Sequence, residues 1–194
     1  MYKTYYKTIL PYCKWASDIF ELKIYVREKC EEIRNKYSQL RLTNEQNLEK
    51  EYTRGKIYGK AYEITYSEQN CEIKKYENND LISLERHIKS EFEKILVEII
   101  THFNIKILRR QKGEHLLECY IRTILQYFNI DMDDFDKQKR IIIKMNKNRN
   151  KSEHESDNLL REIDSDYIDS IANATCDYAD ILIQRIYDEN RKSK

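Results

Sequence analysis

An arginine and a histidine stand five positions apart in the polar stretch NKNRNKSEHESD, residues 146–157. A histidine titrates near neutral pH, so His154 could take a proton from a ribose 2′-hydroxyl or give one to the leaving oxygen. The guanidinium of Arg149 could brace a phosphate as its equatorial oxygens gain charge. Asn150 could orient the histidine or a phosphate oxygen through its amide. These residue types suit cleavage of RNA, with a 2′,3′-cyclic phosphate on the product.

Three lysines, Lys144, Lys147 and Lys151, would supply positive charge for RNA around this pair. The charge has to be local, because 35 Lys and Arg residues nearly cancel 34 Asp and Glu residues in the chain. The sequence shows no carboxylate cluster and no Cys/His group at metal-ligand spacing. We therefore expect neither a metal nor another cofactor, since the attacking hydroxyl would belong to the substrate.

The spacing of this pair limits how its side chains can meet. Five positions on an ideal helix correspond to a rotation of about 140°, so Arg149 and His154 would not converge from one regular surface. Either the backbone breaks within the stretch, or the site is shared between subunits. A second pair at the same spacing, Arg110 and His115 in RRQKGEH, lacks the asparagine and lies in a basic turn. The remaining histidines, His87 and His102, have no matched partner, and we expect packed or surface roles for them.

The composition predicts an all-α protein. Apolar residues make up 40% of the 194 residues, which is enough for one buried core. Charged residues make up 36%, and only three Gly and one Pro are available for the turns of a multistranded sheet.

Three helices are predicted from the N-terminus to Phe103. Residues 17–40 show apolar side chains at spacings of three and four, with Ser17 as the cap and Leu40 at the end of the stripe. Residues 43–76 contain two glycines and β-branched residues that make helix and short strand comparably plausible, and we expect helix. Asp80 is a good N-cap for a core helix with the stripe Leu81, Leu84, Ile88, Phe92, Ile95, Leu96, Ile99 and Phe103.

Three further helices are expected in the second half. Gly113 would end the basic turn, and an antiparallel helix would follow with a buried face of Leu116, Cys119, Tyr120, Ile124 and Phe128. Residues 137–145 form a short helix, with Ile141, Ile142, Ile143 and Met145 as its apolar part, that stops at the polar stretch. The last helix begins at Asp164 or Asp166 and buries Ile168, Ile171, Ala172, Thr175, Ala179, Leu182 and Ile186.

The five cysteines are odd in number and widely separated, which indicates reduced, buried thiols in a cytoplasmic protein. The sequence contains no run of eighteen apolar residues and no apolar N-terminal segment of signal-peptide length. We therefore expect no membrane partner.

The sequence RNKSEH, with Arg149, Asn150 and His154, resembles the RN-x3-H motif of the HEPN superfamily. The resemblance extends over about residues 137–187. It implies a compact antiparallel helical bundle, here residues 79–190, with extra N-terminal helices in residues 1–78 that pack against it or bind a partner, all in one structural unit. It also implies a metal-independent endoribonuclease of a toxin–antitoxin or phage-defence system. Such domains form homodimers with a composite site, and an antitoxin or a defence complex would be a further partner.

One departure from the family pattern leaves other functions open. Glu153 and Glu155 should raise the pKa of the histidine and repel phosphate, as expected of a slow, partner-gated or inactive enzyme. One alternative is a non-catalytic helical module that binds another protein. The other is an RNA-binding regulator that uses the basic segments 106–112 and 137–151 on phosphates without cleavage.

Overall fold

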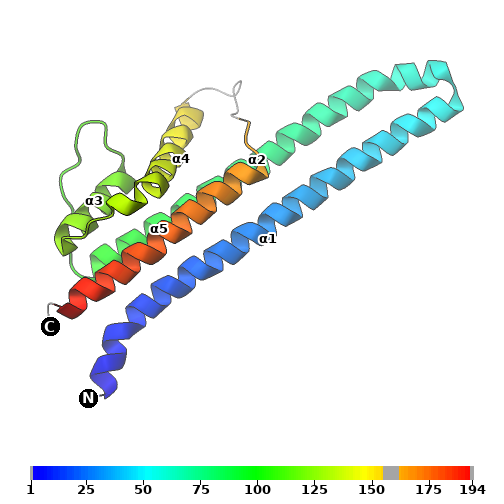
Figure 1. Cartoon of the computed structure of the whole chain (residues 1–194). Coiled ribbons are helices and arrows are strands. Elements are labelled where there is room, and N and C mark those ends of the chain that lie inside the picture. Colours follow the sequence, from blue (N-terminus) through cyan, green and yellow to red (C-terminus); the bar gives the residue numbers. More distant parts are fainter. Residues whose placement is uncertain (1, 155–161, 193–194) are drawn as a thin grey trace.

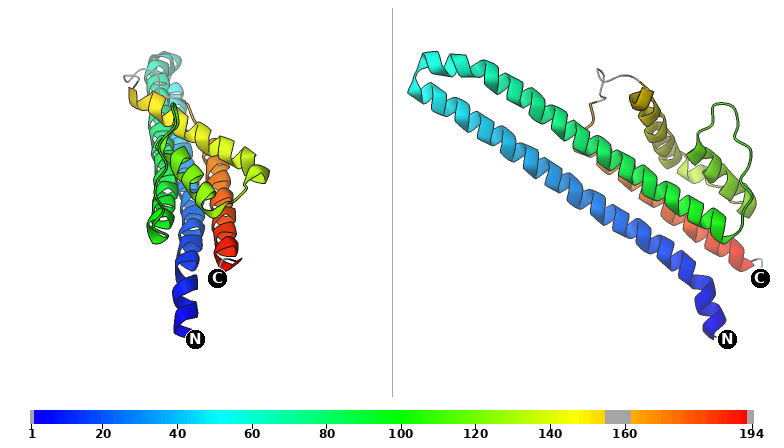
Figure 2. Two further views of the ribbon diagram at one scale, coloured as in Figure 1. Left: turned by 90° about the vertical axis from the view of Figure 1, so that its left-hand side faces the viewer. Right: turned by 180° about the vertical axis from the view of Figure 1, so that it is seen from behind.

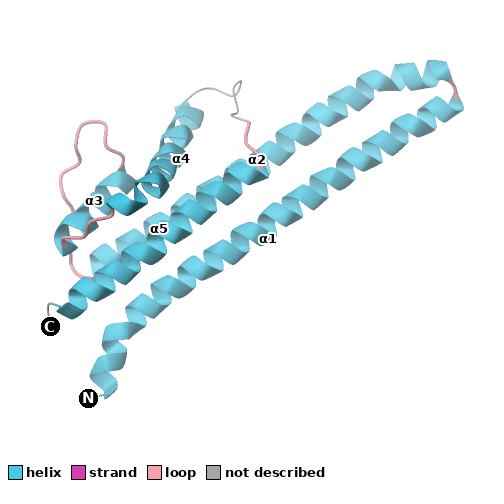
Figure 3. Ribbon diagram, in the orientation of Figure 1, coloured by secondary structure: helices cyan, strands magenta, loops and turns pink. Residues whose placement is uncertain are grey.

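The computed structural model describes the backbone of residues 2–154 and 162–192, and the side chains of residues 11–146 and 162–192. All regular structure in this part of the chain is helical, which confirms the all-α prediction (Figure 3). The elements are α1 (Tyr2–Arg54), α2 (Lys56–His102), α3 (Leu116–Phe128), the 3-10 helix η1 (Asp133–Phe135), α4 (Asp136–His154) and α5 (Ser165–Lys192).

Helices α1 and α2 form a long antiparallel hairpin, and α5 lies along it (Figure 1). The 53 residues of α1 correspond to a length of about 80 Å. The far end of the hairpin, residues 42–72, extends beyond α5 in all views, and we call it the arm (Figure 2). The molecule is therefore elongated, unlike the compact bundle expected from the resemblance.

The core lies where α1, α2 and α5 meet, and apolar stripes on the three helices form it. The predicted stripes of α2 and α5 are buried, except that Phe103 at the end of α2 is half-buried. On α1 the stripe contains Tyr12, Trp15, Ile19, Leu22, Val26, Cys30, Ile33 and Tyr37. Its expected last member, Leu40, is 44% exposed, so the buried stripe ends at Tyr37.

Two predicted helix starts are wrong. Ser17 lies inside α1, and its hydroxyl is 3.4 Å from the Glu21 carboxylate. Asp80 lies inside α2 and joins the two helices, since it accepts hydrogen bonds from the Tyr37 hydroxyl at 2.7 Å and from Lys36 Nζ at 2.9 Å. Asp164 does cap α5, because its carboxylate accepts a hydrogen bond from the backbone N–H of Tyr167 at 2.7 Å.

The expected helix over residues 43–76 is present, but Gly55 divides it between α1 and α2. Gly55 has a φ of 149°, which glycine adopts without strain, and it alone connects the two helices. Next to the turn, a Cβ on Gly59 would lie 2.3 Å from the Tyr52 ring. The absence of a side chain at Gly59 therefore lets the tyrosine of α1 lie against α2.

The tripeptide Phe-Asn-Ile ends both α2 and α3. Asn104 and Asn129 adopt positive φ values of 51° and 52°. The next N–H groups, of Ile105 and Ile130, each donate a hydrogen bond of 2.9 Å to the carbonyl oxygen five residues earlier. This is the Schellman arrangement, which pairs the last carbonyl groups of a helix. Helix α2 thus ends eleven residues before Gly113, which has a φ of 81° and lies in the turn that precedes α3.

The predicted antiparallel pairing of α2 and α3 is also wrong. Segment 103–115 doubles back from the end of α2, so that α3 runs in the same general direction as α2 (Figures 1 and 2). Leu116 is 42% exposed, and the buried face of α3 contains Leu117, Cys119, Ile121, Thr123 and Ile124. The proposed boundary between residues 78 and 79 lies inside α2, and α1 shares one apolar core with the helices that follow.

All five cysteines are free, but only Cys30, Cys119 and Cys176 are buried. Cys13 and Cys71 are exposed, because they lie outside the apolar stripes of their helices. The prediction of buried thiols is therefore wrong for these two. None of the described helices contains a stretch both long and apolar enough to cross a membrane.

Candidate nucleic-acid interface

Helix α4 carries the predicted site residues, and its first half is fixed to the core. Ile142 and Met145 are fully buried, and α4 packs mainly on α5. The sequence predicted that this helix stops at Met145. This prediction is wrong, because the helix continues to His154. The polar stretch is therefore helical over residues 146–154 and is not an interruption there. Asparagine and lysine are moderate helix formers, and the docked first half supplies the nucleus from which such residues can extend a helix.

The continuity of α4 removes one of the two ways of bringing Arg149 and His154 together. With no break between them, their positions remain about 140° apart around the helix and about 7.5 Å apart along it. Arg149 lies seven residues after Ile142, on the same helical face to within about 20°. His154 lies about 120° from that face. The side chains of Lys147, Arg149, Asn150, Lys151 and His154 lie outside the described residues.

The face of α4 that lies opposite the buried Ile142 is basic. Lys137, Arg140 and Lys144 are exposed and follow one another at spacings of three and four residues. Lys147, Lys151 and His154 continue this spacing along the same helix. A hollow of about 470 Å³ lies against the first half of this face, lined by Asp136, Lys137, Arg140, Ile141 and Lys144. We call residues 137, 140, 144, 147, 151 and 154 the basic face of α4.

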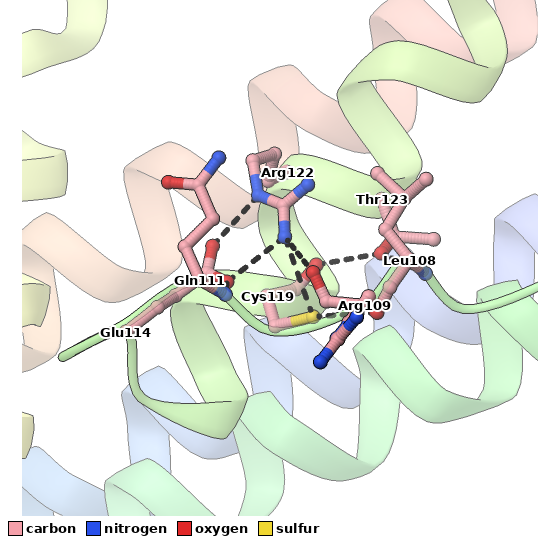
Figure 4. Close-up of polar contacts among 7 residues, drawn as sticks. All are labelled: Leu108, Arg109, Gln111, Glu114, Cys119, Arg122 and Thr123. Carbon is pink, nitrogen blue, oxygen red and sulfur yellow. Dashed lines mark hydrogen bonds and ion pairs between the residues drawn. The ribbon is translucent and has the colours of Figure 1, made fainter.

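A second basic region, segment 103–115, is held in place by one ion pair (Figure 4). Arg122 on α3 donates two hydrogen bonds to the carboxylate of Glu114, from Nε at 2.7 Å and from Nη2 at 2.9 Å. The same carboxylate accepts a hydrogen bond from the N–H of Gln111 at 2.8 Å. The guanidinium of Arg122, helped by that N–H, lowers the pKa of Glu114 to about 2. The carboxylate therefore stays charged at neutral pH.

Two further residues of α3 fix the backbone before the turn. Thr123 Oγ1 accepts a hydrogen bond from the N–H of Leu108 at 3.2 Å and donates one to the carbonyl of Cys119. The Cys119 thiol lies 3.3 Å from the carbonyl oxygen of Leu108, to which it donates. Arg122 also donates a hydrogen bond to the carbonyl of Arg109 at 2.9 Å. A segment without regular structure is thus tied to α3 at several points (Figure 4).

The cations of this segment lie on the protein surface. Lys106, Arg109, Arg110 and Lys112 are exposed, and none forms an ion pair with a described residue. In Figure 4 the Arg109 side chain extends away from Arg122. Of the second arginine–histidine pair, Arg110 is exposed, whereas His115 is half-buried as the residue that precedes α3. The other two histidines have ring contacts, His87 with Tyr25 at 4.7 Å and His102 with Trp15 at 5.6 Å between centroids.

A larger hollow, of about 770 Å³, lies beside the start of α5. Its lining carries charges of both signs and contains two ion pairs. Arg41 bonds Glu77, and Lys74 lies 2.9 Å from Glu162. Among residues 11–146 and 162–192, no three His, Cys, Asp or Glu side chains gather closely enough to hold a metal ion. The two basic regions are therefore the candidate surface for a ligand.

Comparison with known proteins found no matching family model, no similar curated protein and no similar solved structure. What is known of the surface comes from the chain itself. The sequence does contain a signal for the basic face of α4, because its cations recur at helical spacings of three and four residues. The pair Glu114–Arg122 gave no such signal, because its partners lie eight residues apart across a turn.

Proposed function

We propose that the protein is a metal-independent endoribonuclease of the HEPN type, acting in a toxin–antitoxin or phage-defence setting. His154 acts as the general acid or base, Arg149 braces the phosphate, and Asn150 orients one of them. The 2′-hydroxyl of the substrate attacks the adjacent phosphorus, the 5′-oxygen leaves, and the product ends in a 2′,3′-cyclic phosphate.

The observation that carries the proposal is the continuous α4 helix with its basic face. Along this helix Lys144, Lys147 and Lys151 precede His154 at spacings of three and four residues, which supports a role for them as cations that bind an RNA backbone. A protein with nearly balanced charge needs such a local concentration of cations to bind a polyanion.

The geometry of α4 favours a site built by two copies of the chain. Because Arg149 and His154 lie about 140° apart around one helix, the arginine that faces a given histidine would come from the other subunit. We therefore propose a homodimer in which each cleavage site combines Arg149 of one subunit with His154 of the other.

The test is cleavage of total RNA and of tRNA in EDTA by wild type, Arg149→Ala and His154→Ala. We expect wild type to yield fragments with cyclic phosphate ends. His154→Ala should reduce the rate about 10²- to 10⁴-fold, as is usual for a group that moves a proton, and Arg149→Ala about 10²- to 10³-fold, as for a group that stabilises charge in the transition state. His87→Ala is the matched control, because His87 lies on α2 against Tyr25 and should leave cleavage unchanged. Intact RNA with all four proteins would reject the proposal.

A second candidate function is a non-catalytic module that binds another protein. The arm favours it, because Ile57, Tyr58 and Ile64 are exposed there and the two helices of the arm bury little apolar surface. In that case a partner should co-purify with wild type and be lost with Ile57→Ser and Ile64→Ser, whereas Arg149→Ala and His154→Ala should retain it.

A further inference from the structure

Segment 103–115, like the basic face of α4, carries an excess of cations. In α1, α2 and α5 cations alternate with carboxylates, and many form pairs such as Lys14–Asp18 and Lys29–Glu32. Within segment 103–115, Glu114 is the one carboxylate among five Lys, Arg and His residues. The segment therefore presents a cationic surface only if the negative charge of Glu114 does not neutralise these cations.

The carboxylate of Glu114 bonds to α3 and to the backbone, and of the exposed cations Arg110 acts on its charge at longer range. Its side chain is only 10% exposed and is bonded to Arg122 of α3 and to the N–H of Gln111. Because both its oxygens are engaged, it pairs with none of Lys106, Arg109, Arg110 and Lys112. Among the described residues none of the four has an ion-pair partner, so four exposed cations occur within seven residues of the chain.

The same bonds give the segment a fixed backbone. Arg122, Cys119 and Thr123 bond to the main chain at Arg109 and Leu108, so the exposed side chains project from an ordered base. Ordering a flexible loop on binding costs free energy, and a loop ordered in advance avoids most of that cost.

The segment also lies on the side of the molecule that carries α4. Segment 103–115, α3 and α4 lie together on one side of the α1–α2 hairpin, and the turn of the segment points toward the same end as the C-terminal end of α4 (Figures 1 and 2). A single strand of RNA that lies along the basic face of α4 could therefore continue onto this segment.

We infer that segment 103–115 is a preformed phosphate-binding loop, which contacts the backbone of single-stranded RNA through Lys106, Arg109, Arg110 and Lys112. The choice of RNA as the polyanion rests on the proposed function. These four residues hold the strand outside the cleavage site and take no part in the chemistry.

The test measures the affinity for a 20-nucleotide single-stranded RNA as a function of salt, in EDTA and in the His154→Ala protein, so that the RNA is not cut. The loop variant replaces Lys106, Arg109, Arg110 and Lys112 with Gln. The control variant replaces Lys50, Lys56, Lys60 and Lys75, four exposed lysines on or near the arm, with Gln, and it removes the same net charge. Circular dichroism and thermal unfolding check that both variants are folded.

We expect the loop variant to reduce the slope of log K against log salt by about 3, since each phosphate contact on a single strand contributes about 0.7. Its affinity at low salt should fall at least about tenfold, whereas the control should change less than about twofold. Equal slopes for the two variants would overturn the inference, as would tighter binding of polyglutamate than of RNA.

The outcome is distinguishable from failure of the proposed function. RNA that binds through the loop but remains intact with the wild-type protein would support the loop and reject the nuclease. Cleavage by wild type together with an unchanged salt slope in the loop variant would support the nuclease and reject the loop.

Discussion

Arg122 holds the carboxylate of Glu114 through two hydrogen bonds, 2.7 and 2.9 Å long, and so joins α3 to the turn before it. Bidentate pairs of this kind fix geometry as well as adding binding energy. The pair determines both the path of segment 103–115 and the charge that the segment presents to solvent.

The ion pair predicts a defined pH dependence of stability. The pKa of Glu114 is lowered to about 2 in the folded protein, against a usual value of about 4.3 in an unfolded chain. A lowered folded-state pKa means that the stabilisation is present above about pH 4.3 and is lost as the pH falls toward 2. We therefore expect Glu114→Gln to lower the midpoint of thermal unfolding at pH 7, with a difference from wild type that shrinks below about pH 4.3.

The control for this prediction is Glu45→Gln, an exposed carboxylate of α1 for which the structure shows no interaction. Its unfolding midpoint should match that of wild type within about 1 °C at each pH, since exposed positions without contacts contribute little. A Glu114→Gln difference that stays constant from pH 7 to pH 2.5 would contradict the account of the pair.

The cysteines should differ sharply in reactivity. Burial raises the pKa of both Cys30 and Cys176 to about 11, so these thiols remain protonated and enclosed at neutral pH. Cys13 and Cys71 are exposed. Treatment of the native protein with iodoacetamide at pH 8, followed by peptide mass mapping, should label Cys13 and Cys71 first. Rapid labelling of Cys30 or Cys176 without denaturant would show that the core is not closed as described.

The two faces of α4 should respond differently to truncation. Ile142 is fully buried against the core, so Ile142→Ala should reduce the free energy of unfolding by about 2–5 kcal/mol. Lys144, two residues away and exposed, should change it by less than about 0.5 kcal/mol when replaced by Ala. Urea denaturation followed by circular dichroism measures both. Equal effects would show that α4 is not docked through the Ile142 face.

The turn between α1 and α2 gives a test of close packing. A methyl group on Gly59 would lie 2.3 Å from the Tyr52 ring, so Gly59→Ala should destabilise the protein by about 1–3 kcal/mol, as overpacking usually does. Removing the ring with Tyr52→Ala should relieve most of this effect in the double variant, and Lys60→Ala is the exposed control. Additive effects of the two substitutions in urea denaturation would show that the ring and Gly59 are not in contact.

The sequence predicted the apolar faces of the long helices because the same spacing of three and four residues persists through Ile19–Tyr37, Leu81–Ile99 and Ile168–Ile186. It predicted the start of α5 near Asp164 but not where α1 and α2 begin. Ser17 and Asp80 are residue types that cap helices well, but each lies within a helix whose ends are set elsewhere. Local signals of this kind cannot distinguish a cap from an interhelical hydrogen bond such as that between Tyr37 and Asp80.

The ribonuclease chemistry at Arg149 and His154 stays a prediction from their residue types and spacing. The sequence predicted that the helix of residues 137–145 stops at the polar stretch, because the stretch lacks apolar periodicity. Helix α4 continues through it, since a docked helix can extend into solvent when no Gly or Pro interrupts it. The ordered state of segment 103–115 could not be predicted, because it depends on contacts between residues on opposite sides of a turn.

The central claim, a ribonuclease site shared between two copies, is tested most directly by mixing two inactive variants. Arg149→Ala and His154→Ala are each prepared separately, mixed in equal amounts under conditions that exchange subunits, and assayed for RNA cleavage in EDTA. A mixed dimer contains one site with both wild-type residues and one site with neither. Half of the dimers are mixed, so the mixture should regain about a quarter of wild-type activity.

Each variant alone, carried through the same exchange, should remain inactive. A mixture as inactive as its components, although wild type cleaves and mass spectrometry shows mixed dimers, would contradict the shared site. Intact RNA with wild type as well would contradict the nuclease itself.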